Sequence, residues 1–340
     1  MELQILWFIL WGLLWAVYFM LDGFVIGMQM VSGIAKTDTE KRILINTTGP
    51  VWGGNEVWLI TAAGATFAAF PGTYALMFSY LYTALLLLLF ALIIRGVSFE
   101  FRGKIDKPSW KGAWDKTIII TGFLIALLFG ITFGNIFQGL PMDGTGYHGS
   151  FFALFNPYGI LTGVFFLTLF ALHGALYVAV KTEGELCARA EKCAKILWFA
   201  VLLLAVAFLA YSKIVTKLLD NYFHTPLLFS IPLIAVASLA AVKLFMLRNS
   251  WYLAFAASCV TVLFIVFTGL GGLFPNLIPS SIDPAWSLTI FNTSASQYTL
   301  KILTVVALIF VPIVISYKIW IYRIFRERLT EDDVSEPEAY

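Results

Sequence analysis

The stretch that decides the fold is the N-terminal run LQILWFILWGLLWAVYFMLDGFVIGMQMVSGI, residues 3–34, which carries one acidic residue, Asp22, and no basic residue. A helix needs about 20 predominantly apolar residues to cross a bilayer. The run is too long for the apolar core of a cleavable signal peptide, and no basic segment precedes it. We therefore predict that it forms the first transmembrane helix.

Similar apolar runs recur along the whole chain. Prolines divide them, because proline fits the first turn of a helix and breaks a helix interior. Pro71 splits one long run into two, and Pro157 and Pro226 mark helix starts. We expect an all-α integral membrane protein with about nine transmembrane helices, forming a single membrane domain, 1–340. The predicted spans lie near 5–33, 52–70, 74–95, 116–138, 158–180, 195–216, 226–246, 252–273 and 300–323.

The composition agrees with a lipid environment. Of the 340 residues, 60% are hydrophobic and 12% are charged, whereas a soluble domain usually has about 25% charged residues. A net charge of +2, with no dense cluster of Lys and Arg, argues against a nucleic-acid partner. The three cysteines form neither a CxxC pair nor a disulfide framework. Membrane lipid is the expected surrounding.

Basic residues are distributed unevenly between the two sides of this predicted bundle. The loops after odd-numbered spans, together with the C-terminal tail, hold 19 of the 22 Lys and Arg residues, and the opposite loops hold 3. Basic residues concentrate in cytoplasmic loops. We therefore predict a multi-pass protein with its N-terminus outside and its C-terminus in the cytoplasm.

A few ionisable side chains lie at membrane depth. Each costs about 2.5–3.5 kcal/mol at a helix centre, so it is a functional candidate. Asp22 and Glu56 are each about four turns from the cytoplasmic end of their span, roughly 15–20 Å deep in regular helices. Arg95 ends the third span and Glu100 follows it. We predict that these four residues form a proton pathway from the cytoplasm; a structural ion pair is the alternative.

Other polar and aromatic residues carry weaker signals. Trp52, Asn55 and Trp58 flank Glu56 and suit either a quinone ring or helix packing. Haem sites in membrane bundles usually need histidines, and His173 is the one histidine deep in a span, where a satisfied core residue is the expected role. We predict no catalytic residue and no metal site in this chain.

Several segments together resemble subunit II of the cytochrome bd-type quinol oxidases, in the order of that family. They are LDGFVIG at 21–27, TEKRILINTTGPVWGGNEVWLITAAGATFAAFP at 39–71, RGVSFEFRGKI at 95–105, FGNIFQGLP at 133–141, FNPYGILTG at 155–163, TEGEL at 182–186, FPNLIPSS at 274–281 and SQYTLKILTVVALIFVPI at 296–313.

The resemblance implies two four-helix bundles plus one peripheral helix, in a bacterial inner membrane. It also implies a partner, subunit I, that carries two b-type haems and one d-type haem and oxidises quinol, while this chain ligates no haem. A small single-helix accessory subunit and a structural quinone are further partners that the family implies. In such a complex the protons for oxygen reduction come from the cytoplasm.

The match also shows two departures from the family. Asp22 corresponds to the acid of the family's DG segment and inherits a proposed role in proton transfer. The acid that commonly follows the tryptophan of the GPxW segment is Gly53 here, and a second acid of the DG segment is Val25. Glu56, three residues after Gly53, is our candidate substitute.

Two other functions remain open at this stage. A secondary transporter could use Asp22 and Glu56 as coupling residues, although such transporters usually have two comparable halves. A purely structural partner subunit is the other alternative. Proton-uptake measurements and the identity of the co-purifying chain distinguish an oxidase subunit that delivers protons from a transporter and from a purely structural subunit.

Overall fold

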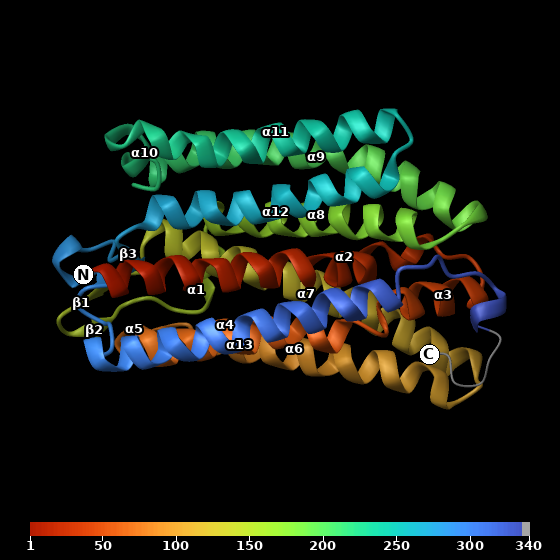
Figure 1. Cartoon of the computed structure of the whole chain (residues 1–340), viewed down its shortest axis with the longest axis horizontal. Coiled ribbons are helices and arrows are strands. Elements are labelled where there is room, and N and C mark those ends of the chain that lie inside the picture. Colours follow the sequence, from red (N-terminus) through yellow and green to blue (C-terminus); the bar gives the residue numbers. More distant parts are fainter. Residues whose placement is uncertain (335–340) are drawn as a thin grey trace.

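The computed structural model describes residues 1–334; the last six residues of the expected membrane domain, 335–340, lie outside this part. The described chain is a bundle of roughly antiparallel long helices (Figure 1). The helices are α1 (Glu2–Leu21), α2 (Gly23–Val31), α3 (Asp38–Thr48), α4 (Trp52–Ala69), α5 (Pro71–Tyr80), α6 (Tyr82–Phe101), α7 (Pro108–Gln138), α8 (Pro157–Lys181), α9 (Gly184–Val215), α10 (Asp220–His224), α11 (Ser230–Leu247), α12 (Trp251–Leu273) and α13 (Gln297–Ile324).

Within residues 1–334, eight helical segments are long and apolar enough to cross a membrane. The remaining predicted span, near 52–70, is α4, which is rich in glycine and carries Glu56. It runs beside α1 (Figure 1). The prediction of about nine membrane helices therefore agrees with the structure.

Helix contacts divide the bundle as expected. The α1/α2 span, α4, the α5/α6 segment and α7 pack together, and α8, α9, α11 and α12 form the second group. The two groups are joined by extensive contacts of α8 with α7 and α2, and by contacts of α12 with α1. Helix α13 lies along the outside of the first group (Figure 1), and Leu300 is its one buried residue in the described chain.

Local sequence explains several helix ends. Helices α5 and α8 begin at Pro71 and Pro157, as predicted, and the side chain of Asn156 accepts a hydrogen bond from the Gly159 amide at the start of α8. A short 3₁₀ turn (Pro226–Phe229) precedes α11. The Asn156 side chain pairs one free amide of a first turn. A proline at the first helical position has no amide N–H that would be left unpaired.

The structure differs from the predicted spans in four places. The first span is interrupted at Asp22, and the span near 74–95 is interrupted at Leu81. The connection between the predicted spans 74–95 and 116–138 is shorter than those bounds imply, because α6 continues to Phe101 and α7 begins at Pro108. Helix α9 begins at Gly184 rather than near 195, since helix formation continues past the apolar window into charged residues that water can solvate.

The two longest connections, 139–156 and 274–296, are joined to each other. Short antiparallel pairs form within them, between β1 (Met142–Asp143) and β2 (Gly146–Tyr147), and between β3 (Asn276–Ile278) and β4 (Leu288–Thr289). A backbone bridge then links Leu140 to Ser280. The N-terminus lies at this end of the bundle, and α13 ends at the other (Figure 1).

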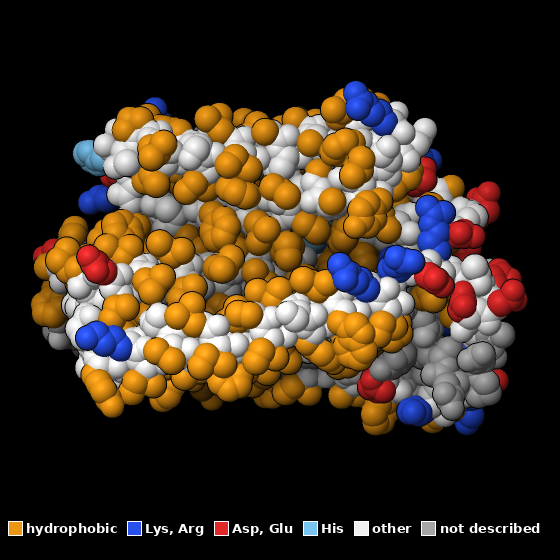
Figure 2. Space-filling model, viewed as in Figure 1, with side chains coloured by type: hydrophobic (Ala, Val, Ile, Leu, Met, Phe, Trp, Pro, Cys, Tyr) orange, Lys and Arg blue, Asp and Glu red, His pale blue; other side chains and the backbone are white. Residues whose placement is uncertain are grey.

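Charged side chains lie mainly at the two ends of the molecule, and hydrophobic ones cover the middle (Figure 2). In the same view, most of the acidic side chains and several basic ones are at the end that holds α3. A belt of this kind is the expected surface of a protein that spans a bilayer.

Candidate functional site

The polar centre of the bundle is an ion-paired cluster of three residues, Asp22, Arg95 and Glu56. Asp22 lies between α1 and α2, Arg95 is on α6 and Glu56 is on α4. Arg95 NH1 is 2.8 Å from Asp22 Oδ2, and Arg95 NH2 is 3.1 Å from Glu56 Oε2. The structure therefore brings together three of the four residues predicted for a proton pathway.

The three side chains of this cluster differ in burial. Those of Asp22 and Arg95 are fully buried, whereas that of Glu56 is 23% exposed. Because the guanidinium stays protonated in proteins, two ionised carboxylates give the cluster a net charge of −1. Taking up one proton neutralises it, and a buried site favours that neutral state.

Asp22 has a second polar neighbour besides Arg95. Within residues 1–334, Asp22 Oδ1 and the hydroxyl of Tyr18, one turn earlier on α1, are both buried and have no hydrogen-bond partner other than each other. Buried polar atoms are nearly always paired. The Tyr18 hydroxyl therefore belongs to the same buried polar cluster as Asp22 and Arg95.

Glu100 does not join the cluster. It is exposed on α6 and takes part in none of the ion pairs of the described residues. The ion pairs at this end of α6 centre instead on Arg102, whose guanidinium contacts Asp115 at 2.5 Å and Asp38 at 2.7 Å. Lys41 and Lys111 complete this charge network. Sequence reasoning missed it, because its members come from three separate segments.

Asn55 and His173 bind the backbone at the interruption of the first span. The Asn55 side chain donates to the Leu21 carbonyl at 2.7 Å, and His173 Nε2 is 2.9 Å from the Met20 carbonyl oxygen. Since both ring nitrogens of His173 have partners, it is the satisfied core histidine that the sequence predicts.

Asn55 also contacts the peripheral helix. Its Oδ1 accepts from the Tyr322 hydroxyl at 2.9 Å and from Lys318 Nζ at 3.2 Å. Sequence reasoning counted Lys318 only as a cytoplasmic-side charge. Its place within an apolar run, several residues before the basic end of the helix, is a signal that could have identified it.

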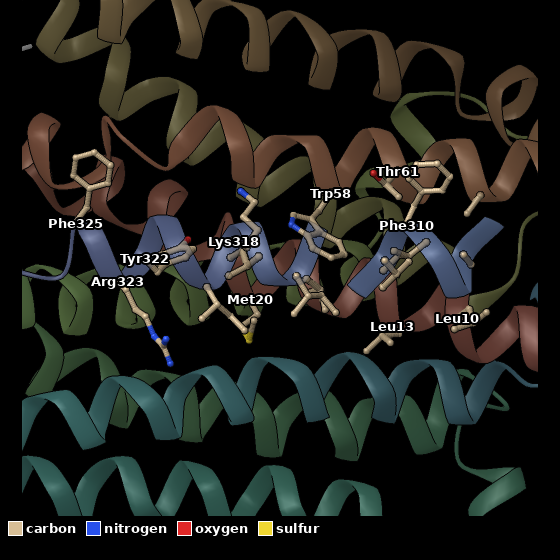
Figure 3. Close-up of a pocket in the computed structure, with 18 of the residues that line it drawn as sticks. Leu10, Leu13, Met20, Trp58, Thr61, Phe310, Lys318, Tyr322, Arg323 and Phe325 are labelled. Atoms are coloured by element: carbon tan, nitrogen blue, oxygen red, sulfur yellow. The ribbon is translucent and has the colours of Figure 1, made fainter. Parts of the chain in front are cut away.

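A cavity of about 1490 Å³ lies between α13 and the helices α1, α4, α8 and α12. Its wall is mostly apolar, and Figure 3 shows Trp58, Lys318, Tyr322 and Arg323 among the residues around it. Of the three residues predicted for quinone contact or packing, Trp58 lines the cavity. Asn55 does not, and Trp52 instead packs on Phe99, with ring centroids 5.6 Å apart.

The sequence model of the family described as cytochrome bd terminal oxidase subunit II matches residues 3–325. The chain belongs to this family. It is 36% identical to the cytochrome bd ubiquinol oxidase subunit 2 of Bacillus subtilis, over 100% of this chain and 99% of that protein. It is 35% identical to the cytochrome bd-I ubiquinol oxidase subunit 2 of Escherichia coli, over 98% and 96%.

The fold is also that of a chain in a solved bd oxidase structure. A chain of the bd oxidase from Geobacillus thermodenitrificans superimposes with a TM-score of 0.78 at 18% identity, covering 96% of this chain and 99% of that chain. Among residues 1–334, no group of three or more His, Cys, Asp or Glu side chains could hold a metal ion.

The two departures from the usual subunit II pattern lie in different surroundings. Gly53 is exposed on α4, and a Cβ atom there would have no described atom within 4 Å. Val25 is fully buried on α2. An acid at position 53 would therefore face away from this bundle, whereas Glu56 on the next turn reaches Arg95 inside it.

Proposed function

We propose that this chain is the haem-free subunit II of a quinol:oxygen oxidase in a bacterial aerobic respiratory chain. We propose further that its Asp22–Arg95–Glu56 cluster passes cytoplasmic protons toward the oxygen-reduction site of subunit I. The observation that carries this proposal is one buried arginine shared by two carboxylates at membrane depth. Ionisable groups inside a membrane are costly and mark ion or proton pathways.

The different exposure of the two carboxylates supports a direction of transfer. Glu56, the partly exposed member, exchanges protons with the surroundings of the bundle. Asp22, the fully buried member, lies further inside, against Arg95 and the Tyr18 hydroxyl, and would receive the proton from Glu56. Arg102 directly follows the end of α6, two turns beyond Arg95, and its charge network would supply a polar entrance at this end.

The unequal distribution of basic residues supports the orientation in which that end faces the cytoplasm, with the N-terminus outside. Labelling single cysteines from each side of sealed vesicles tests it. Cysteine at Asp283, in the outer connection, should react from outside, and cysteine at Asp106, in the inner loop, should not.

A direct test of proton transfer uses Glu56→Gln and Asp22→Asn in the purified complex with its partner subunit. We expect either variant to slow oxygen-coupled proton uptake by about a hundredfold, the lower range for a positioned acid or base. Haem content should stay unchanged. Glu185→Gln, at an exposed glutamate of α9, is the matched control and should behave as the unaltered protein. Unchanged uptake in both site variants would leave a purely structural role.

The partners of this chain are part of the proposal. A homologous subunit I would carry two b-type haems and one d-type haem, and a single-helix accessory subunit would complete the complex. The exposed apolar faces, with α13 the most exposed, are available to these chains and to lipid. Mass spectrometry of the intact complex, together with its haem spectrum, identifies the partners. A chain that purifies alone would favour the transporter alternative.

A structural quinone is proposed for the cavity that Trp58 lines. An aromatic side chain on an otherwise apolar wall suits a quinone ring and its isoprenoid tail. Solvent extraction of the purified complex should yield more quinone than the substrate site of subunit I accounts for. Trp58→Ala should lose that excess, whereas Trp52→Ala, away from the cavity, should keep it.

A further inference from the structure

The structure assigns Asn55 and His173 as positioning residues that hold the first span open at Asp22, with α13 attached to the same point through Asn55. This inference rests on the proposed function only in giving Asp22 a role in proton transfer. The direction of the Asp22 carboxylate can be tested separately from proton transfer.

The interruption of the first span has an identifiable cause. In a regular α-helix each carbonyl accepts from the amide four residues ahead. Here the carbonyls of Met20 and Leu21, the last two residues of α1, accept from the side chains of His173 and Asn55. A side chain that inserts into the hydrogen-bond ladder is a known origin of a helix break.

His173 approaches the break from α8 and is held firmly there. Its ring is fully buried and stacks on Phe255 of α12, with centroids 5.0 Å apart and planes 13° apart. Nδ1 is 2.7 Å from the Ser258 hydroxyl oxygen. Because a carbonyl oxygen can only accept, Nε2 carries the proton that binds Met20. The second four-helix group thus supplies one of the two contacts.

Asn55 approaches from α4 and makes three contacts. Its amide donates to Leu21, while its oxygen accepts from Lys318 and Tyr322 of α13. A Cβ atom on the adjacent Gly54 would come within 2.5 Å of Lys318 Nζ, so glycine leaves the room that this lysine occupies. The next residue, Glu56, pairs with Arg95. Adjacent residues on α4 therefore connect the break, the ion-paired cluster and α13.

The consequence concerns the direction of the Asp22 carboxylate. The break separates α1 from α2 at this residue, and the carboxylate meets Arg95 at 2.8 Å. If regular backbone hydrogen bonds formed through residues 20–25, the two helices would become one continuous α-helix. The backbone at Asp22 would then rotate, and its side chain would turn relative to Arg95. A displacement of about 1 Å is enough to slow a positioned reaction by roughly a hundredfold.

The test uses variants that remove the donors but keep their volume. His173→Phe keeps the stacked ring and loses Nε2, whereas His173→Gln retains an amide donor. Asn55→Leu removes the second contact, and Tyr322→Phe removes one hydrogen bond to α13 without touching the break. His224→Phe, at an exposed histidine, is the matched control. All are examined as the complex with the partner subunit.

We expect structures of the His173→Phe and Asn55→Leu complexes to show Asp22 beyond hydrogen-bonding distance of Arg95. Proton uptake should be slower by about tenfold to a hundredfold, with His173→Gln restoring most of the rate. The inference would be overturned if both variants kept the interruption between α1 and α2 and also kept Asp22 paired with Arg95. If either complex fails to assemble, Tyr322→Phe decides: proton uptake equal to that of the control overturns the coupling to α13.

The two proposals fail differently. Wild-type uptake in Asp22→Asn and Glu56→Gln would refute the proton role while the geometry could still respond to His173→Phe. A fixed geometry in His173→Phe and Asn55→Leu would refute the positioning role while Asp22 could still carry protons.

Discussion

At the residue scale, the central feature is Arg95. A buried ion pair often stabilises a protein little, because desolvation offsets the attraction, but removing one partner leaves an uncompensated buried charge. Arg95 pairs with two carboxylates at once, and its side chain has no exposure in this bundle. The two acids at membrane depth therefore depend on it as their shared counter-ion.

We expect Arg95→Gln to lower the free energy of unfolding by about 3–5 kcal/mol, the cost typical of a broken buried pair. Equilibrium unfolding in mixed micelles measures this change. Arg248→Gln, at an exposed arginine following α11, is the control and should change stability by less than about 0.5 kcal/mol. Equal stability of the two variants would contradict a shared counter-ion role for Arg95.

At the element scale, the crossing of α2 and α8 brings two backbones into contact. A Cβ atom on Gly27 would lie 1.8 Å from the Phe170 carbonyl oxygen, and one on Gly174 would lie 2.1 Å from the Gly27 carbonyl carbon. Small residues permit such close approach of membrane helices. The same crossing sets His173, next to Gly174, against the break at Asp22.

Gly27→Ala should therefore lower the free energy of unfolding by about 1–3 kcal/mol, the usual range for overpacking. The comparison is Gly112→Ala on α7, where a Cβ atom meets no described atom within 4 Å. In a helix with free space, alanine should be neutral or stabilise by about 0.4–1 kcal/mol. Thermal unfolding of the two purified complexes measures the difference, and a stable Gly27→Ala protein would mean that the crossing can widen.

At the scale of the whole molecule, charge pairs at the end of the bundle that holds α3 connect segments that are distant in the chain. Burial raises the pKa of Asp38, but hydrogen bonds and charges from Arg102 and Lys111 outweigh it and hold this pKa below its ordinary value. The pKa of Glu40 is lowered in the same way, against the effect of burial, by the Lys36 amide and by Arg189. These contacts link α3 to the turn that follows α6, to α7 and to α9.

A lowered carboxyl pKa makes folding depend on pH in a definite direction. The stabilisation is fully present above the unfolded-state values, about pH 4, and is lost as pH falls through the lower folded-state values. We expect the melting temperature of the complex to fall below about pH 4. The Asp38→Asn, Glu40→Gln double variant should show a flatter profile over that window. Identical profiles would show that this end contributes nothing to acid stability.

The sequence by itself determined the membrane environment, most helix positions and the three ionisable residues at depth. It could do so because hydropathy and charge cost belong to each segment separately. The structure added that Arg95 bridges both acids, that Glu100 stays outside, and that Trp58 rather than Trp52 lines the cavity. It also decided the opening at Asp22, since that depends on His173 and Asn55 reaching two carbonyls from other helices. Helix rotation and such contacts arise from packing between segments far apart in the chain, which no local pattern records.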